Sequence, residues 1–204
     1  MFAKIFKLKI FLSFLLCFVC ILGDYLTNRS KSRSVTKALV DNTTHGLVGL
    51  ICGFILVGPF RERLTTCEAH SMLLVAYLVA SGIDADHFLE ARSFKLTDAL
   101  NLPKRPFLHC STIPLVIFTL LLMTLKFSKS LIACLWLSVF FLAFATHHLR
   151  DSIRRGHWFY PLGSVNPTPY PIYLIGSILL PHFMVYLISR SIHLNQSQHE
   201  EFTV

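Results

Sequence analysis

The sequence predicts an all-α fold, a polytopic membrane helix bundle of about six transmembrane helices. Of the 204 residues, 53% are hydrophobic and only 15% are charged, whereas about a quarter of the residues of a soluble domain are charged. The apolar residues gather in several long runs with polar segments between them. Because lipid offers the backbone no hydrogen bonds, such runs cross a membrane as helices. We expect one transmembrane domain over residues 1–188 and a polar, disordered tail over residues 189–204.

The net charge indicates the kind of partner, and the cysteine spacing argues against a disulfide framework. A net charge of +8 suits a protein that lies against anionic headgroups, so the expected partner is the lipid bilayer. The basic residues are scattered and form no basic helix or arm, which argues against nucleic acid. The six cysteines show no framework spacing, and we interpret them as small buried side chains. The sequence indicates no oligomeric state.

The first apolar run, residues 10–23, follows Lys4, Lys7 and Lys9. A basic segment before a short apolar run is also the pattern of a cleaved signal peptide. Counted from Phe2, however, the segment reaches the roughly 20 residues that a membrane crossing needs. We therefore prefer an uncleaved first span that ends at Asp24.

Five further runs complete the expected bundle. The second is expected to begin after an N-cap at Asn42 or Thr43, and Pro181 is expected to interrupt the last. Three glycines spaced at three and four residues in the second run indicate a flat helix face suited to close packing. The five runs cover residues 46–60, 66–83, 113–125, 131–146 and 170–188.

Six alternating crossings place the carboxylates and imidazoles on one side of the membrane. Residues that follow an odd-numbered span or precede an even-numbered one share that side, opposite both termini. Basic residues do not segregate in this way, so they give no orientation. The aspartate and histidine residues of this side are Asp24, Asp41, His45, Asp84, Asp86, His87, Asp98, His109, His147, His148, Asp151 and His157.

Several of these side chains have the chemistry and spacing of metal ligands. His147 and Asp151 are four residues apart and lie on one helix face. Imidazole together with carboxylate suits zinc, iron(II) or manganese. Each residue taken alone is explained as a polar helix end, and only the shared face favours a site. The expected ligands of one or two divalent metals are His45, Asp84, His87, His109, His147 and Asp151.

Asp84 and Asp86 are not equivalent in this prediction. If the third helix continues past Gly82, Asp84 and His87 share a face and Asp86 points elsewhere. If the helix ends at Gly82, all three side chains can turn toward one ion. Asp84 is expected to be the stronger ligand.

The motifs, taken in order, resemble two families. The sequence is similar to the animal transmembrane protein 267 family over residues 24–181, through Asp41-Asn42 with His45, Asp84 with Asp86-His87-Phe88, Ala91-Arg92-Ser93, the stretch from Arg105 to Thr112, and His147-His148 with Arg150-Asp151. It resembles more distantly the bacterial LexA-regulated inner-membrane metal-dependent hydrolases. It departs from the bacterial pattern, which has His, Thr and Ser where this chain has Lys104, Leu108 and Cys110.

The bacterial resemblance implies, by analogy, a metal-dependent hydrolase. Our first hypothesis is that this hydrolase acts on a lipid-like or interfacial ester or phosphoester. In this hypothesis Asp86 and Arg105 are the catalytic residues, and Arg105 holds a phosphate or another anionic headgroup. A non-catalytic membrane protein with a structural metal or a polar Asp/His clasp is the alternative. An ion carrier is a third hypothesis, but the acidic groups lie at helix ends and not in the middle of the membrane.

Overall fold

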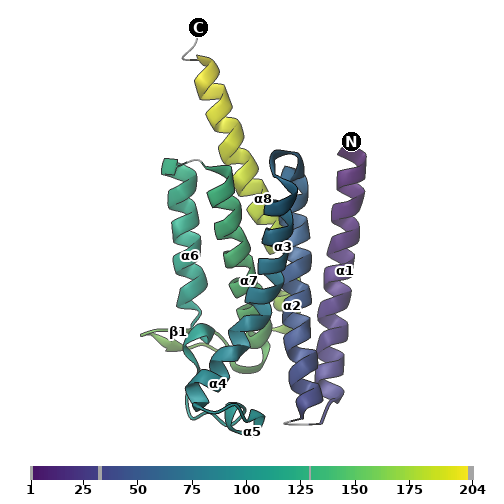
Figure 1. Ribbon diagram of the computed structural model, residues 1–204, viewed down its shortest axis with the longest axis vertical. Coiled ribbons are helices and arrows are strands. Elements are labelled where there is room, and N and C mark those ends of the chain that lie inside the picture. Colours follow the sequence, from purple (N-terminus) through teal and green to yellow (C-terminus); the bar gives the residue numbers. More distant parts are fainter. Residues whose placement is uncertain (1, 32–33, 129, 202–204) are drawn as a thin grey trace.

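The computed structural model describes residues 2–31, 34–128 and 130–201. The chain folds into a bundle of long helices (Figure 1). Its helices are α1 (Phe2–Arg29), α2 (Val35–Val57), α3 (Thr66–Gly82), α4 (Asp86–Ala91), α5 (Leu96–Ala99), α6 (Thr112–Met123), α7 (Leu131–Arg155) and α8 (Tyr170–Glu201). Short 3₁₀ helices are η1 (Gly58–Arg63), η2 (Ile83–Ala85) and η3 (Phe107–His109), and a π-helical turn, η4 (Thr124–Ser128), follows α6. A small hairpin pairs β1 (Trp158–Phe159) with β2 (Gly163–Ser164) in antiparallel register.

Five helical segments of the described chain are long and apolar enough to cross a membrane, which confirms the predicted helix bundle. They are Phe6–Arg29, Val35–Arg63, Thr66–Ala91, Leu131–Arg155 and Tyr170–Ile192. The fourth expected span, residues 113–125, corresponds to a shorter apolar helix, Thr112–Ser128, which is not among these five. It nevertheless runs beside α7, and the free ends of α1 and α8 lie at the same end of the bundle (Figure 1).

Several helices continue beyond the boundaries expected from hydropathy. α1 runs past Asp24 to Arg29, and α7 runs past residue 146 to Arg155. α2 begins at Val35 after the N-cap Ser34, so the expected caps at Asn42 and Thr43 are wrong. The reason is that polar side chains in these extensions bind one another across helices, which removes the cost of leaving water.

The last helix also differs from expectation. α8 continues through Pro181 without a break, as membrane helices can when neighbours satisfy the freed backbone groups. His182 pairs with Ser13 of α1, with 2.8 Å between Nε2 and Oγ. The expected disordered tail is not tested: α8 extends to Glu201, and the side chains of residues 193–204 lie outside the described part of the chain.

Helices α2 and α7 form the centre of the bundle. α2 packs against α1, α3, α7 and α8, and α7 packs against α2, α3, α6 and α8. Their shared core includes Ile55, Leu56, Leu135 and Leu142. The polar ends of these central helices therefore meet at one place, at the end of the bundle where α4, α5 and the hairpin lie (Figure 1).

The glycine stripe of α2 packs against α3, as the spacing predicts. A Cβ atom at Gly49 would lie 2.6 Å from the Ala76 carbonyl oxygen and 2.6 Å from Ala80 Cβ. A Cβ at Gly46 would meet the Tyr77 ring at 2.6 Å. The absence of side chains lets the α2 and α3 backbones approach closely.

We expect Gly49→Ala to lower stability by about 1–3 kcal/mol, because backbone atoms of α3 must move to admit the methyl group. Gly58→Ala is the matched control, since a Cβ there meets no atom within 4 Å. The measurement is thermal unfolding of the detergent-purified variants. Equal melting temperatures for the two variants would contradict the close α2–α3 contact.

Candidate metal centre

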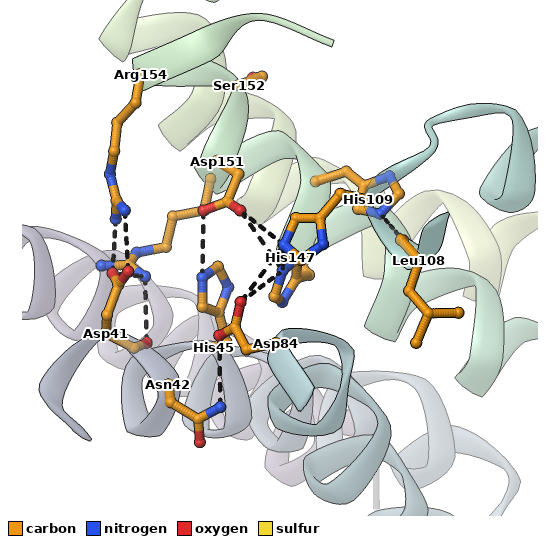
Figure 2. A network of polar contacts seen from close by, with 12 residues as sticks. Asp41, Asn42, His45, Asp84, Leu108, His109, His147, Asp151, Ser152 and Arg154 are labelled. Atoms are coloured by element: carbon orange, nitrogen blue, oxygen red, sulfur yellow. Dashed lines mark hydrogen bonds and ion pairs between the residues drawn. The ribbon is translucent and has the colours of Figure 1, made fainter. Parts of the chain in front are cut away.

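Four side chains converge where α7 passes the turn between α3 and α4 (Figure 2). α3 ends at Gly82, and the tighter 3₁₀ turn η2 carries Asp84 before α4 begins at Asp86. His109 lies in η3, just before α6. His147 and Asp151 lie one turn apart on α7. The cluster therefore joins three segments that are far apart in the sequence.

Five of the six separations among the four ligand atoms match those of a tetrahedral metal site, and the sixth, between the Asp84 and Asp151 oxygens, is within 4.8 Å. His109 Nε2 lies 3.3 Å from His147 Nε2, and 3.4 Å from both Asp84 Oδ1 and Asp151 Oδ2. His147 Nε2 lies 3.6 Å from the same two oxygens. A tetrahedron with metal–ligand bonds of 2.0–2.2 Å has edges of about 3.3–3.6 Å. These separations exceed the usual hydrogen-bond range of about 2.7–3.2 Å.

In His109 and His147, the hydrogen bond made by Nδ1 determines whether Nε2, which faces the cluster, carries a proton. His147 Nδ1 lies 2.8 Å from the Ala80 carbonyl oxygen, which can only accept a hydrogen bond. His109 Nδ1 lies 3.2 Å from Asp86, which also accepts from the Leu108 N–H at 2.8 Å. With both outer nitrogens donating, the Nε2 lone pairs of the neutral rings point at each other and need a cation between them.

A proton is the alternative cation. Burial alone lowers the pKa of His109, but the interactions of its ring N–H groups with the carboxylates of Asp151, Asp84 and Asp86, which accept, outweigh burial and raise the pKa to about 11. The carboxylates that would retain a proton on His109 would equally attract a divalent metal.

The second carboxylate oxygens of Asp84 and Asp151 have polar neighbours outside the group of four, on α2. Asn42 bonds the Ser81 carbonyl at 2.6 Å and approaches Asp84 Oδ2 at 3.4 Å. His45 Nε2 lies 3.4 Å from Asp151 Oδ1, and its ring stacks on His147 with 3.8 Å between centroids. His45 thus lies next to the group of four that it was expected to join.

His87 lies on the far side of His109 and not beside Asp84. Its Nδ1 is 3.2 Å from Asp86 Oδ1, and its ring meets His109 edge to face. Asp86, His87 and His109 form a second group with ligand-type spacing. The sequence predicts two alternative arrangements: Asp84 and His87 on one helix face, or Asp84, Asp86 and His87 around one ion. The structure has neither, because the 3₁₀ turn places Asp84 in one group and Asp86 with His87 in the other.

Arg105, expected to bind an anion, is engaged with the backbone at the end of α7. Its guanidinium donates to the Gly156 carbonyl at 3.0 Å and also to the Arg155 carbonyl. Gly156 has a φ of 65°, and a Cβ there would collide with the Val165 carbonyl. The contact positions Arg105 on the wall of the cavity that opens onto the cluster.

That cavity has a volume of about 550 Å³. Asp84, His109 and Asp151 line its inner end, while α2, α4 and α5 contribute apolar side chains. The Asp84 and Asp151 side chains are each 28% exposed. A small molecule can therefore reach the carboxylate side of the cluster, whereas His147 is buried behind it.

His148 is a polar residue of the cavity wall that the sequence prediction did not single out. It is 4% exposed, and its Nε2 lies 2.8 Å from the Leu108 carbonyl oxygen, to which it must donate. Its Nδ1 therefore carries a lone pair, and within the described residues that atom has no partner. The signal in the sequence was its place directly after His147.

The sequence prediction also missed a buried ion-pair network beside the cluster. Arg150 is fully buried and lies 2.9 Å from Asp24 of α1 and 2.6 Å from Asp41 of α2. Arg154, one turn further along α7, binds both oxygens of Asp41 at 2.9 and 2.6 Å (Figure 2). Hydropathy gave no signal for this network, because Arg150 lies beyond the apolar run expected over residues 131–146.

The fold and the cluster define a multi-pass α-helical membrane protein with a polar centre at one end of its bundle. The chain is 38% identical to Transmembrane protein 267 of Bos taurus over 153 residues, 74% of this chain and 69% of the relative. It is 38% identical to the Mus musculus protein of the same name and 36% identical to that of Danio rerio, each over 74% of this chain and over 70% and 67% of the relative, respectively.

The chain belongs to the Transmembrane protein 267 family, as its motifs indicated. No family model matches it, and no solved structure matches it. Nothing in these comparisons supports the resemblance to the bacterial hydrolases. The names of the relatives state a membrane location and no activity.

We expect Arg150→Ala to destabilise the protein by roughly 3–5 kcal/mol, because it leaves the buried Asp24 carboxylate without a cation, while Asp41 keeps Arg154. Arg154→Ala should cost less, since its side chain is 38% exposed and water can replace it. Thermal or denaturant unfolding in detergent measures both. A smaller loss for Arg150→Ala than for Arg154→Ala would show that the buried pair contributes nothing to stability.

Proposed function

We propose that this protein is a membrane-embedded, metal-dependent hydrolase of ester or phosphoester bonds. The observation that carries the proposal is the grouping of His109 Nε2, His147 Nε2, Asp84 Oδ1 and Asp151 Oδ2. The five separations that involve a histidine nitrogen are 3.3–3.6 Å, as at a tetrahedral site. Two imidazoles and two carboxylates suit zinc, iron(II) or manganese. The tetrahedral spacing favours zinc among them.

A divalent ion bound there would supply the chemistry common to metal hydrolases: it acidifies a water molecule and polarises an ester or phosphoryl oxygen. The residues of the chain would support that chemistry from their observed positions. Asp86 orients His109 through the Nδ1 hydrogen bond, and Asn42 and His45 restrain the two carboxylates. The Nδ1 of His148 is buried and has no partner among the described residues, and we propose it as a proton acceptor at the cavity wall.

This assignment changes the roles expected for Asp86 and Arg105. Asp86 is 5% exposed and accepts from Leu108 and His109, so we propose that it positions His109 and does not touch the substrate. Arg105 remains a cationic wall of the cavity, held by two carbonyls. We propose His148, and not Asp86, as the residue that accepts a proton.

A metal-free polar clasp is the second candidate function. The observation that favours it is the pKa of His109, raised to about 11 by the surrounding carboxylates after allowing for burial. A protonated His109 would neutralise part of the charge of Asp84 and Asp151 and link α6 to α3 and α7. The clasp needs no open cavity, whereas a hydrolase does.

Metal analysis distinguishes the two candidates. We expect the purified protein to contain about one divalent ion per chain, and His109→Ala and His147→Ala to lose most of it, more than the 10–100-fold loss in affinity typical of changes to supporting residues. Asp86→Asn should show that smaller loss, because His109 is the one residue of the four proposed ligands that Asp86 contacts among the described pairs.

His70→Ala is the matched control for the metal measurement. His70 is exposed and lies near the start of α3, at the opposite end of that helix from Asp84. Its metal content should equal that of the wild type. An unchanged metal content in both His109→Ala and His147→Ala, or no metal in the wild type, would leave the clasp.

Turnover tests the proposed reaction. The zinc-loaded protein should hydrolyse at least one member of a panel of lipid-like esters and phosphoesters, and a chelator should abolish the activity. Asp84→Asn should lose metal and turnover together. His148→Phe should keep its metal and lose about 10²–10⁴-fold in kcat, the usual contribution of a proton acceptor. A fully active His148→Phe would remove this residue from the reaction.

A further inference from the structure

The mouth of the cavity is apolar on the outside as well as the inside. Val35 and Leu39 of α2 line it with 63% and 62% of their surface exposed, and Phe94, between α4 and α5, lines it with 99% exposed. Large apolar side chains that project from a cavity mouth are unfavourable in water. They are favourable where the mouth meets hydrocarbon.

The position of the mouth agrees with contact to the bilayer. Val35 and Leu39 belong to the candidate membrane span Val35–Arg63. Arg92 and Lys95 flank Phe94 in the sequence, an arrangement typical of segments that lie at the headgroup level. An acyl chain in the bilayer can therefore enter the cavity sideways without passing through water.

The charges inside the cavity favour an anionic head. Arg154 is neutralised by Asp41, and the Arg105 guanidinium binds two carbonyls without losing its charge. Arg155 also lines the cavity, and no carboxylate of the described residues pairs with it. A divalent ion would balance Asp84 and Asp151, which leaves Arg105 and Arg155 as excess positive charge. Guanidinium groups bind phosphate strongly.

We infer that this cavity binds a membrane amphiphile with one apolar chain between α2 and α5 and a phosphate-bearing head beside Asp84, His109 and Arg155. The inference rests on the proposed function, because it places the bond to be cleaved at the metal centre. The volume of about 550 Å³ lies within the range of about 300–1,000 Å³ found for small-molecule sites. A second chain, where the amphiphile has one, stays in the bilayer.

The test is equilibrium binding of radiolabelled oleoyl lysophosphatidate to the zinc-loaded protein in detergent. Ala38 lines the cavity, so Ala38→Trp should fill the chain site and weaken binding about tenfold or more. Thr36→Trp is the matched control, since Thr36 is exposed on the same helix and does not line the cavity. It should bind as the wild type does.

Two comparison ligands separate the chain from the head. Monooleoylglycerol has the chain without the charge and should bind more weakly than the lysophosphatidate. Inorganic phosphate has the charge without the chain and should not displace it at equal concentration. Arg155→Gln should weaken the lysophosphatidate about fivefold or more and leave monooleoylglycerol unchanged. This exposed substitution keeps the test valid if Ala38→Trp fails to fold.

The outcomes distinguish this inference from the proposed function. Zinc in the protein, with binding that neither Ala38→Trp nor Arg155→Gln changes, overturns the inference and leaves the hydrolase proposal standing. If the protein takes up no zinc, the same assay is made on the metal-free protein, and binding that both substitutions weaken supports the amphiphile site and overturns the hydrolase. Displacement by inorganic phosphate as effective as by the lipid shows that the site is for free anions, which also overturns the inference.

Discussion

The buried Arg150 is the interaction on which the arrangement of the metal centre depends. It draws Asp24 of α1 and Asp41 of α2 to the same turn of α7. Desolvating these three charges is costly unless all are paired, so α7 has few rotations about its axis in which the network closes. In the observed rotation, His147 and Asp151, three residues before and one after Arg150, face η2 and η3. The ion pairs thereby set which side of α7 the cluster occupies.

Particular residues show how far the sequence predicts this structure and where the prediction stops. Apolar runs predicted the helices, and their alternation predicted that Asp84, His109, His147 and Asp151 share one end of the bundle. Hydropathy placed the helix ends wrongly, because it assigns charged residues such as Asp24 and Arg150 to solvent. In the structure the two side chains form an ion pair and are both buried. Hydropathy is a property of single residues, whereas this burial is a property of pairs.

Asp84 and Asp86 also differ in role because of their neighbours and not because of their own residue type. The 3₁₀ turn between α3 and α4 sends their side chains to opposite nitrogens of one ring, His109. Helical periodicity alone could not reveal this, since it assumes one helix type through residue 87. The result is a chain of contacts from the Leu108 N–H through Asp86 and His109 to the cluster, which fixes both the orientation and the tautomer of the ring.

His109 and His148 are connected through the backbone between α5 and α6. Asp86 accepts the Leu108 N–H, and His148 donates to the Leu108 carbonyl oxygen. One residue in the segment before α6 therefore aligns the carboxylate that orients His109 and the imidazole proposed to accept a proton. Since Leu108 precedes His109 directly, any shift of this segment would move the metal ligand and the proposed base together. The segment is anchored at its start by Arg105 on the end of α7, so the rigid end of the central helix determines the geometry of the cavity.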